Sequence, residues 1–129
     1  MKIVALVARI LLGLIFVVFG LNGLLKFIPG SDMVPPGVAG QFVTAMGQTQ
    51  YLHVVSLLQV LGGALVLSGF FVPLGLVVLG PILFNILCFH VFFLHGAGAM
   101  PGVVSTILWF VVFIRYRENF AGIFAMKTL

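Results

Sequence analysis

Polar residues interrupt one long apolar stretch of the chain at positions where they could carry hydrogen-bonding chemistry. They are Pro81, Asn85, Cys88 and His90, within a run from residue 74 to residue 94 that lacks Asp, Glu, Lys and Arg. A run of about 20 apolar residues is long enough to cross the ~30 Å hydrocarbon core as a helix. Because lipid offers no hydrogen-bond partner, Asn85 and His90 must turn toward protein, backbone or a water-filled cavity. These two side chains therefore predict where other helices stand.

The composition of the whole chain indicates an integral membrane protein. Of its 129 residues, 63% are hydrophobic and only 6% are charged, too few charges to cover the surface of a soluble domain. The net charge of +4 is too small and too scattered for nucleic-acid binding. The single cysteine, Cys88, excludes an internal disulfide and a thiolate cluster. The three histidines, His53, His90 and His95, lack the spacing and the nearby carboxylates of a metal site, so we expect no metal.

Four stretches are apolar and long enough to cross a membrane as helices. Their ranges are about 3–25, 51–72, 74–95 and 102–117. Prolines and glycines break the pattern in residues 27–50, where Pro36 favours a short helix with one apolar side. That helix would lie at the interface, either as a lid over the outer end or as a loop seated on the surface. We expect a single all-α domain over residues 1–129, an antiparallel bundle of four transmembrane helices with a short interfacial helix in the first outer loop.

The basic residues indicate which side of the membrane holds the ends of the chain. Near the start and the end of the sequence lie Lys2, Arg9, Arg115, Arg117 and Lys127. Lys and Arg are enriched on the cytoplasmic side of membrane proteins. Lys26, with Asp32 on the outer loop, is the exception. The sequence therefore predicts a multi-pass protein of the cell (inner) membrane with both termini in the cytoplasm.

Small residues and one proline predict how the helices pack. The packing residues are Gly13, Gly20, Gly62, Gly63 and Pro81, together with Arg9. Gly13, Gly20 and Arg9 share one helical face, and small residues let two helices approach closely. Pro81 removes a backbone donor and favours a kink about one turn before Asn85. Arg9 either snorkels to the cytoplasmic headgroups or joins a buried polar cluster.

Polar side chains from all four expected helices fall at similar depths in the outer half of the bundle, at about 1.5 Å per helical residue. They are Asn22, Gln59, Asn85, His90 and Trp109. One interpretation is an amphipathic ligand pocket that opens outward between apolar walls. The other is a hydrogen-bond network that only fixes helix register. His90 is roughly 140° from Asn85 on an ideal helix, so both face one interface only if the kink redirects them.

Successive motifs of the chain resemble the DoxX family of small four-helix membrane proteins. They are ARILLGLIFVVFGLN at 8–22, FIP at 27–29, QVLGG at 59–63, FVPL at 71–74, PILFNI at 81–86 and FH at 89–90. The match covers most of residues 8–95 in order. Gln59 stands where the family pattern has glutamate, so an ionisable group that could pair with Arg9 is missing here.

The resemblance implies an accessory membrane subunit, redox-associated, with a quinone or similar lipophilic ligand. His90 and Asn85 would hydrogen-bond the ring oxygens, and Trp109 or a phenylalanine would pack on the ring. The sequence shows no haem pair, flavin fingerprint or thiol pair, so electrons would come from a partner or a bound quinone. The alternative is a non-catalytic assembly or chaperone protein, and a third is a small-molecule transporter. Whether the chain is an enzyme stays open. The expected partners are the lipid bilayer, a membrane or redox protein and a second copy of the chain.

Overall fold

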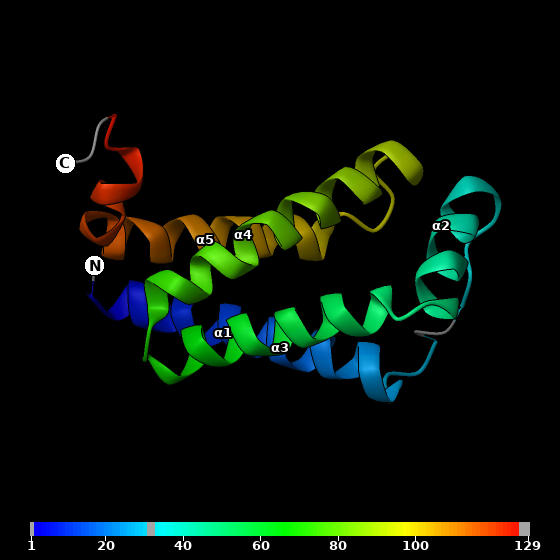
Figure 1. Cartoon of the computed structure of the whole chain (residues 1–129), viewed down its shortest axis with the longest axis horizontal. Coiled ribbons are helices and arrows are strands. Elements are labelled where there is room, and N and C mark those ends of the chain that lie inside the picture. Colours follow the sequence, from blue (N-terminus) through cyan, green and yellow to red (C-terminus); the bar gives the residue numbers. More distant parts are fainter. Residues whose placement is uncertain (1, 31–32, 127–129) are drawn as a thin grey trace.

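The computed structural model describes residues 2–30 and 33–126, and within these residues the chain is helical and has no strand (Figure 1). The elements are α1 (Lys2–Leu25), α2 (Gly37–Gln48), α3 (Tyr51–Ser68), α4 (Val72–Cys88), the π-helix η1 (Phe89–Phe93), α5 (Met100–Tyr116) and the 3-10 helix η2 (Arg117–Phe124). The predicted all-α class is confirmed for the described part of the chain.

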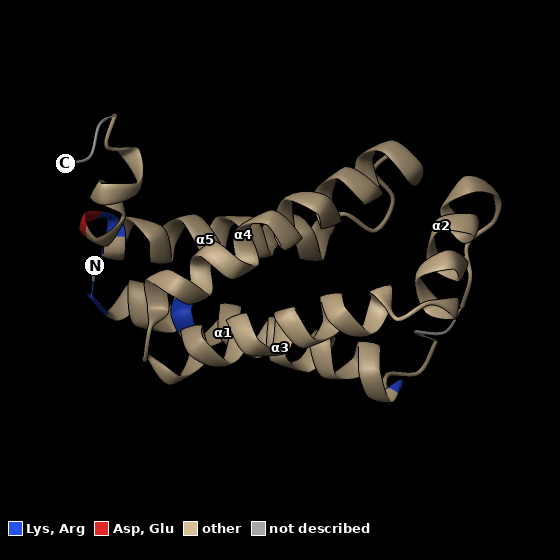
Figure 2. Ribbon diagram, in the orientation of Figure 1, with Lys and Arg blue, Asp and Glu red and all other residues tan. Residues whose placement is uncertain are grey.

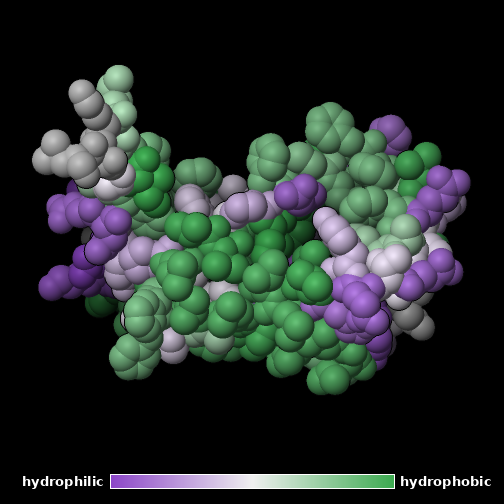
Figure 3. Space-filling model, viewed as in Figure 1, coloured by the Kyte–Doolittle hydropathy of each residue, from purple (hydrophilic) through white to green (hydrophobic). Residues whose placement is uncertain are grey.

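Four helical stretches are long and apolar enough to cross a membrane. They are Lys2–Leu25, Tyr51–Ser68, Val72–Phe93 and Met100–Phe124. Figure 3 shows an apolar surface over the middle of the molecule, with hydrophilic residues toward its two ends. Exposed apolar side chains are expensive in water but not in lipid. The chain is therefore a multi-pass membrane protein, as the composition predicts.

The second span ends earlier than the sequence predicted. Gly69 has a φ of 85° and Phe71 a φ of 59°, and both values lie in the left-handed region that ends a helix. Val72 and Pro73 consequently belong to α4, where proline at the second position needs no backbone donor. The predicted range 51–72 is one turn longer than α3, although Gly69 and Pro73 are residue types that mark a turn.

The four long helices contact one another in a ring. α1 contacts α3 and α5, and α4 contacts the same two helices. Their shared core contains the fully buried Leu12, Val66, Leu76, Leu79 and Val112. Figure 1 shows that the first residues of α1 and the helix η2 lie at the same end of the molecule, which is called the terminal end below. Figure 2 shows that Lys and Arg gather at this end, except for one position just after α1 at the opposite end.

The short helix α2 stands across the other end of the molecule, beside η1 (Figure 1). Pro36 immediately precedes its first residue with a φ of −75°, as the proline position predicted. The Phe42 ring lies 5.5 Å from the Phe89 ring and 5.3 Å from the Phe93 ring, measured between centroids. This aromatic contact holds α2 against the end of the third span.

Glycines allow α1 and α3 to approach at backbone distance. A Cβ atom on Gly13 would lie 2.6 Å from Leu67 Cβ, and one on Gly63 would lie 2.9 Å from the Val17 nitrogen. Gly20 lies against Val60 in the same way. Along the contact, the residue numbers therefore increase in α1 while they decrease in α3. The two helices therefore run in opposite directions, with a seam that excludes larger side chains.

We expect Gly13→Ala to lower the free energy of unfolding by about 1–3 kcal/mol, because the added methyl group collides with the Leu67 backbone. Thermal unfolding in mild detergent, followed by circular dichroism, measures the change. Gly47→Ala is the control, since a Cβ there has nothing within 4 Å. Equal unfolding midpoints for the two variants would contradict the close α1–α3 contact.

Candidate functional site

Trp109 joins α5 to α4 beside the proline of α4. Pro81 has no N–H to donate to the Val77 carbonyl, and Trp109 Nε1 donates to the neighbouring Leu76 carbonyl at 3.0 Å. The indole stacks on the Phe113 ring at 5.3 Å with an angle of 8° between the planes. Gly80 leaves room for it, since a Cβ there would lie 3.6 Å from Trp109 Cζ2. The polar atom of Trp109 is therefore committed to an interhelical bond.

Asn85 lies on an exposed face of α4 and bonds to its own helix. Its Nδ2 donates to the Pro81 carbonyl at 2.8 Å, one turn earlier. An amide side chain has two N–H donors and a carbonyl oxygen. Within residues 2–30 and 33–126, no further hydrogen bond of the Asn85 side chain is found. One donor and the Oδ1 acceptor therefore remain available on the outside of the helix.

His90 also bonds to its own helix, in the π-helical turn η1. Its Nδ1 lies 2.8 Å from the Ile86 carbonyl oxygen. A carbonyl only accepts, so the proton of the neutral ring belongs on Nδ1, and Nε2 is left as an acceptor. The ring packs edge-on against Phe89 and lies beside Gly98. A neutral His90 can therefore accept a hydrogen bond from a hydroxyl but cannot donate one to a quinone carbonyl.

Asn22 closes the turn that follows α1. It is 8% exposed, its Oδ1 accepts from the Ile28 N–H at 2.8 Å, and its carbonyl accepts from the Lys26 N–H at 2.8 Å. Gln59 is half-buried on α3, and a Cβ on Gly20 would lie 3.0 Å from Gln59 Cβ. In the described part of the chain, its amide makes no hydrogen bond. Asn22 is thus a structural cap, while Gln59 packs at the glycine seam.

Arg9 reaches from α1 to the end of α3. Its Nη1 donates to the Val66 carbonyl at 3.0 Å and to the Leu67 carbonyl at 3.3 Å. The last carbonyls of a helix lack intrahelical partners and carry partial negative charge, so a guanidinium is favourable there. Gly69 makes the contact possible, since a Cβ there would lie 2.6 Å from Arg9 Nη1. Arg9 therefore caps α3.

The polar residues expected to line an outer pocket are directed to separate places. Asn22 bonds to its own turn, Asn85 and His90 to their own helix, and Trp109 to α4. Among residues 2–30 and 33–126, no hydrogen bond joins any two of these side chains or Gln59. The structure thus gives Asn22, Asn85, His90 and Trp109 separate partners, and none of them is shared.

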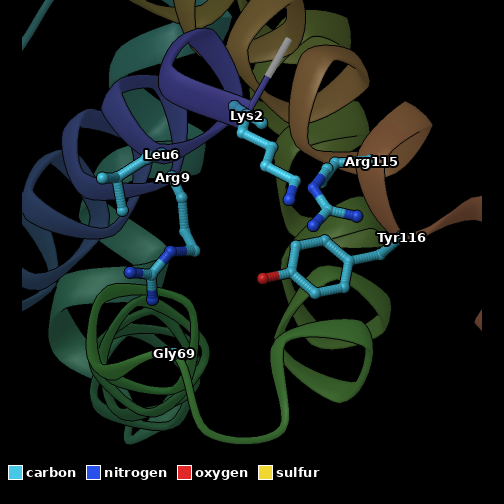
Figure 4. A pocket seen from close by; sticks show the side chains of 7 residues that line it. Lys2, Leu6, Arg9, Gly69, Arg115 and Tyr116 are labelled. Atoms are coloured by element: carbon cyan, nitrogen blue, oxygen red, sulfur yellow. The ribbon is translucent and has the colours of Figure 1, made fainter.

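Two cavities were not foreseen from the sequence. An apolar cavity of about 290 Å³ lies between α4 and α5, lined by Gly80, Leu83, Phe84, Leu87, Thr106, Trp109 and Phe110. A basic cavity of about 330 Å³ lies at the terminal end, lined by Lys2, Ala5, Leu6, Arg9, Gly69, Arg115 and Tyr116 (Figure 4). The sequence held a signal for the second cavity, because Lys2, Arg9 and Arg115 lie near the two ends of the chain, and these ends meet where α1 begins and α5 ends.

No family model, curated protein or solved structure matches the chain. The resemblance of the sequence to the DoxX family therefore stays a prediction.

We expect Trp109→Phe to reduce stability by about 1 kcal/mol through the lost bond to the Leu76 carbonyl, in addition to the lost indole packing. Thermal unfolding followed by circular dichroism tests this. Ile107→Leu, at a position 59% exposed on the same helix, is the control and should unfold at the wild-type temperature. A Trp109→Phe variant as stable as that control would show that the indole bond contributes nothing.

Proposed function

We propose that this chain is an accessory membrane subunit of the DoxX type, which works by binding another membrane-spanning polypeptide along the exposed face of α4. The observation that carries the proposal is the Asn85 amide, which lies on that face with hydrogen-bonding capacity unused. Asn22, Asn85, His90 and Trp109 each hydrogen-bond to a different main-chain group of the protein. This arrangement supports binding of a partner helix rather than a pocket in which the four side chains share one ligand. This function is related to the alternative drawn from the sequence, a non-catalytic assembly or chaperone protein that binds another membrane subunit.

The depth of Asn85 makes its exposure expensive. It lies 13 residues beyond Val72 in a span of 22 residues, or about 20 Å along the helix. That position falls within the hydrocarbon core, where an amide without partners is unfavourable. A polar side chain or an accessible carbonyl on a neighbouring transmembrane helix would complete its hydrogen bonds.

The rest of the face fits an apolar helix. Val77 and Phe92 lie near Asn85 in the helical repeat and are 45% and 74% exposed, and Pro81 between them is exposed as well. The partner of matching chemistry is a helix with small and apolar residues and one polar group at the depth of Asn85. In a second copy of this chain, that group would be Asn85 itself, paired across a two-fold axis.

The same proposal places the molecule in the membrane. The four spans form an antiparallel bundle in the cell (inner) membrane, α2 lies at the outer interface, and the terminal end faces the cytoplasm. The basic residues Lys2, Arg9, Arg115 and Arg117 at that end support this orientation (Figure 2). Lys127 and Asp32, which entered the sequence argument, lie outside the described residues.

We expect Asn85→Leu to weaken partner binding about 3- to 30-fold, the effect of one interhelical hydrogen bond in a membrane. Native mass spectrometry of protein extracted in mild detergent measures the retained partner and tells a second copy from another polypeptide by mass. Val77→Leu adds apolar bulk to the same face, keeps Asn85 and should retain the partner. Equal retention by both variants would sink the proposal, provided that circular dichroism shows both to be folded.

A second candidate function, binding of a quinone-type ring, is favoured by the apolar cavity between α4 and α5. Trp109 and Phe110 offer aromatic surfaces there, with centroids 5.1 Å apart. The cavity has few donors, because Trp109 Nε1 bonds to Leu76 and the Thr106 hydroxyl donates to the Gly102 carbonyl at 2.7 Å. It therefore suits the apolar face of a ring or its hydrocarbon tail better than the ring oxygens.

We expect Gly80→Leu to fill this cavity and remove a lipophile that accompanies the wild-type protein in stoichiometric amount. Solvent extraction and mass spectrometry identify and count the molecule. Gly80→Ala is the matched control, since its Cβ makes only ordinary contact with the indole at 3.6 Å and leaves the cavity open. The quinone function fails if folded Gly80→Leu protein keeps the molecule, or if wild-type protein carries bulk phospholipid alone.

A further inference from the structure

Half of the basic side chains of the protein surround one cavity. The chain has six Lys and Arg residues, and Lys2, Arg9 and Arg115 line the same space of about 330 Å³ at the terminal end. They come from the start of α1, its third turn and the end of α5. In Figure 4, Lys2 from α1 and Arg115 from α5 bring their cationic ends close together, Arg9 lies across the opening beside Gly69, and the Tyr116 hydroxyl points into the space between.

The positive charge of the cavity is not balanced from within the site. Within residues 2–30 and 33–126, no acidic side chain lines it. Glu118, the one acid among residues 2–30 and 33–126, lies on a neighbouring cavity with Arg115 and Arg117. Lys2 and Arg115 are exposed and Arg9 is half-buried, so water screens part of the repulsion between the three cations but does not remove it. An anion between them would relieve the repulsion and form charge-assisted hydrogen bonds.

The basic side chains of the cavity are held in place and still have N–H donors for a ligand. Only Nη1 of Arg9 is used for the carbonyls at the end of α3, so Nε and Nη2 retain donors. The Arg115 guanidinium carbon lies 5.9 Å from the centre of the Tyr116 ring, within the range of a cation–π contact. This contact keeps Arg115 and the Tyr116 hydroxyl on the same wall of the cavity.

We propose that this cavity binds a phosphate-bearing anion. Phosphate oxygens match the fork of an arginine, the ammonium of a lysine and a phenolic hydroxyl. The volume exceeds that of a phosphate alone, and Ala5 and Leu6 supply an apolar wall that suits a glycerol or acyl portion. The phosphate can belong to the headgroup of an anionic phospholipid or to a soluble phosphate ester, and the experiment below separates the two. This site lies apart from Asn85 and does not depend on the proposed subunit contact.

The test compares two double variants with the same loss of charge. Lys2→Gln/Arg115→Gln removes cations from the cavity and leaves Arg9, which caps α3, in place. Lys26→Gln/Arg117→Gln removes cations that do not line it. Each protein is placed in nanodiscs of phosphatidylcholine with about a third phosphatidylglycerol, and native mass spectrometry counts the phosphatidylglycerol retained after release. We expect at least a tenfold lower retention for the cavity variant and wild-type retention for the control.

A second arm uses wild-type protein in neutral detergent with glycerol 3-phosphate as the soluble probe, measured by isothermal titration calorimetry. Saturable binding that phosphatidylglycerol does not compete away assigns the site to a soluble ester. Retention of phosphatidylglycerol without binding of the probe assigns it to the lipid. The proposal is overturned if neither ligand binds, or if both double variants lose phosphatidylglycerol equally. That last result would reflect net charge alone.

Discussion

The glycine seam between α1 and α3 sets the geometry on which much of the molecule depends. Because Gly13 has no side chain, the Leu67 backbone lies against it, and Arg9, one turn earlier on α1, reaches the Val66 and Leu67 carbonyls. That bond satisfies the end of α3 and leaves part of the guanidinium facing the basic cavity. This one close contact thereby sets the distance between α1 and α3, the position of the Arg9 side chain at the end of α3, and one wall of the basic cavity.

Hydrocarbon imposes a second constraint, since a polar side chain there must find its partner within protein. Several of the polar side chains in the spans find it in a main-chain carbonyl: Trp109 at Leu76, His90 at Ile86 and Thr106 at Gly102. Such bonds hold the helices and their side chains in place but leave few donors for a ligand. Asn85 differs, because within the described residues only its Nδ2 has a partner. Its other N–H and its Oδ1 would face lipid unless another protein contacts them.

Much of the fold could be predicted from the sequence, because apolar runs of sufficient length mark the spans and Pro36 marks the start of α2. The range 51–72 ran past the end of α3, because it included Gly69 and the residues after it, which form the turn to α4. Depth along a helix placed the polar residues at similar heights, but depth says nothing about the direction in which each side chain points or about carbonyl acceptors one turn away. The basic cavity was missed because the cations were interpreted singly, as markers of orientation.

The single tryptophan of the chain gives the protein a fluorescent reporter beside Pro81 of α4. Trp109 alone contributes indole emission, and its N–H is bonded to the Leu76 carbonyl, beside the helical turn that Pro81 disrupts. The emission maximum of indole depends on the polarity around it and on the hydrogen bond of its nitrogen. A change in the separation of α4 and α5 at this level would therefore alter the fluorescence of the unmodified protein, with no added dye.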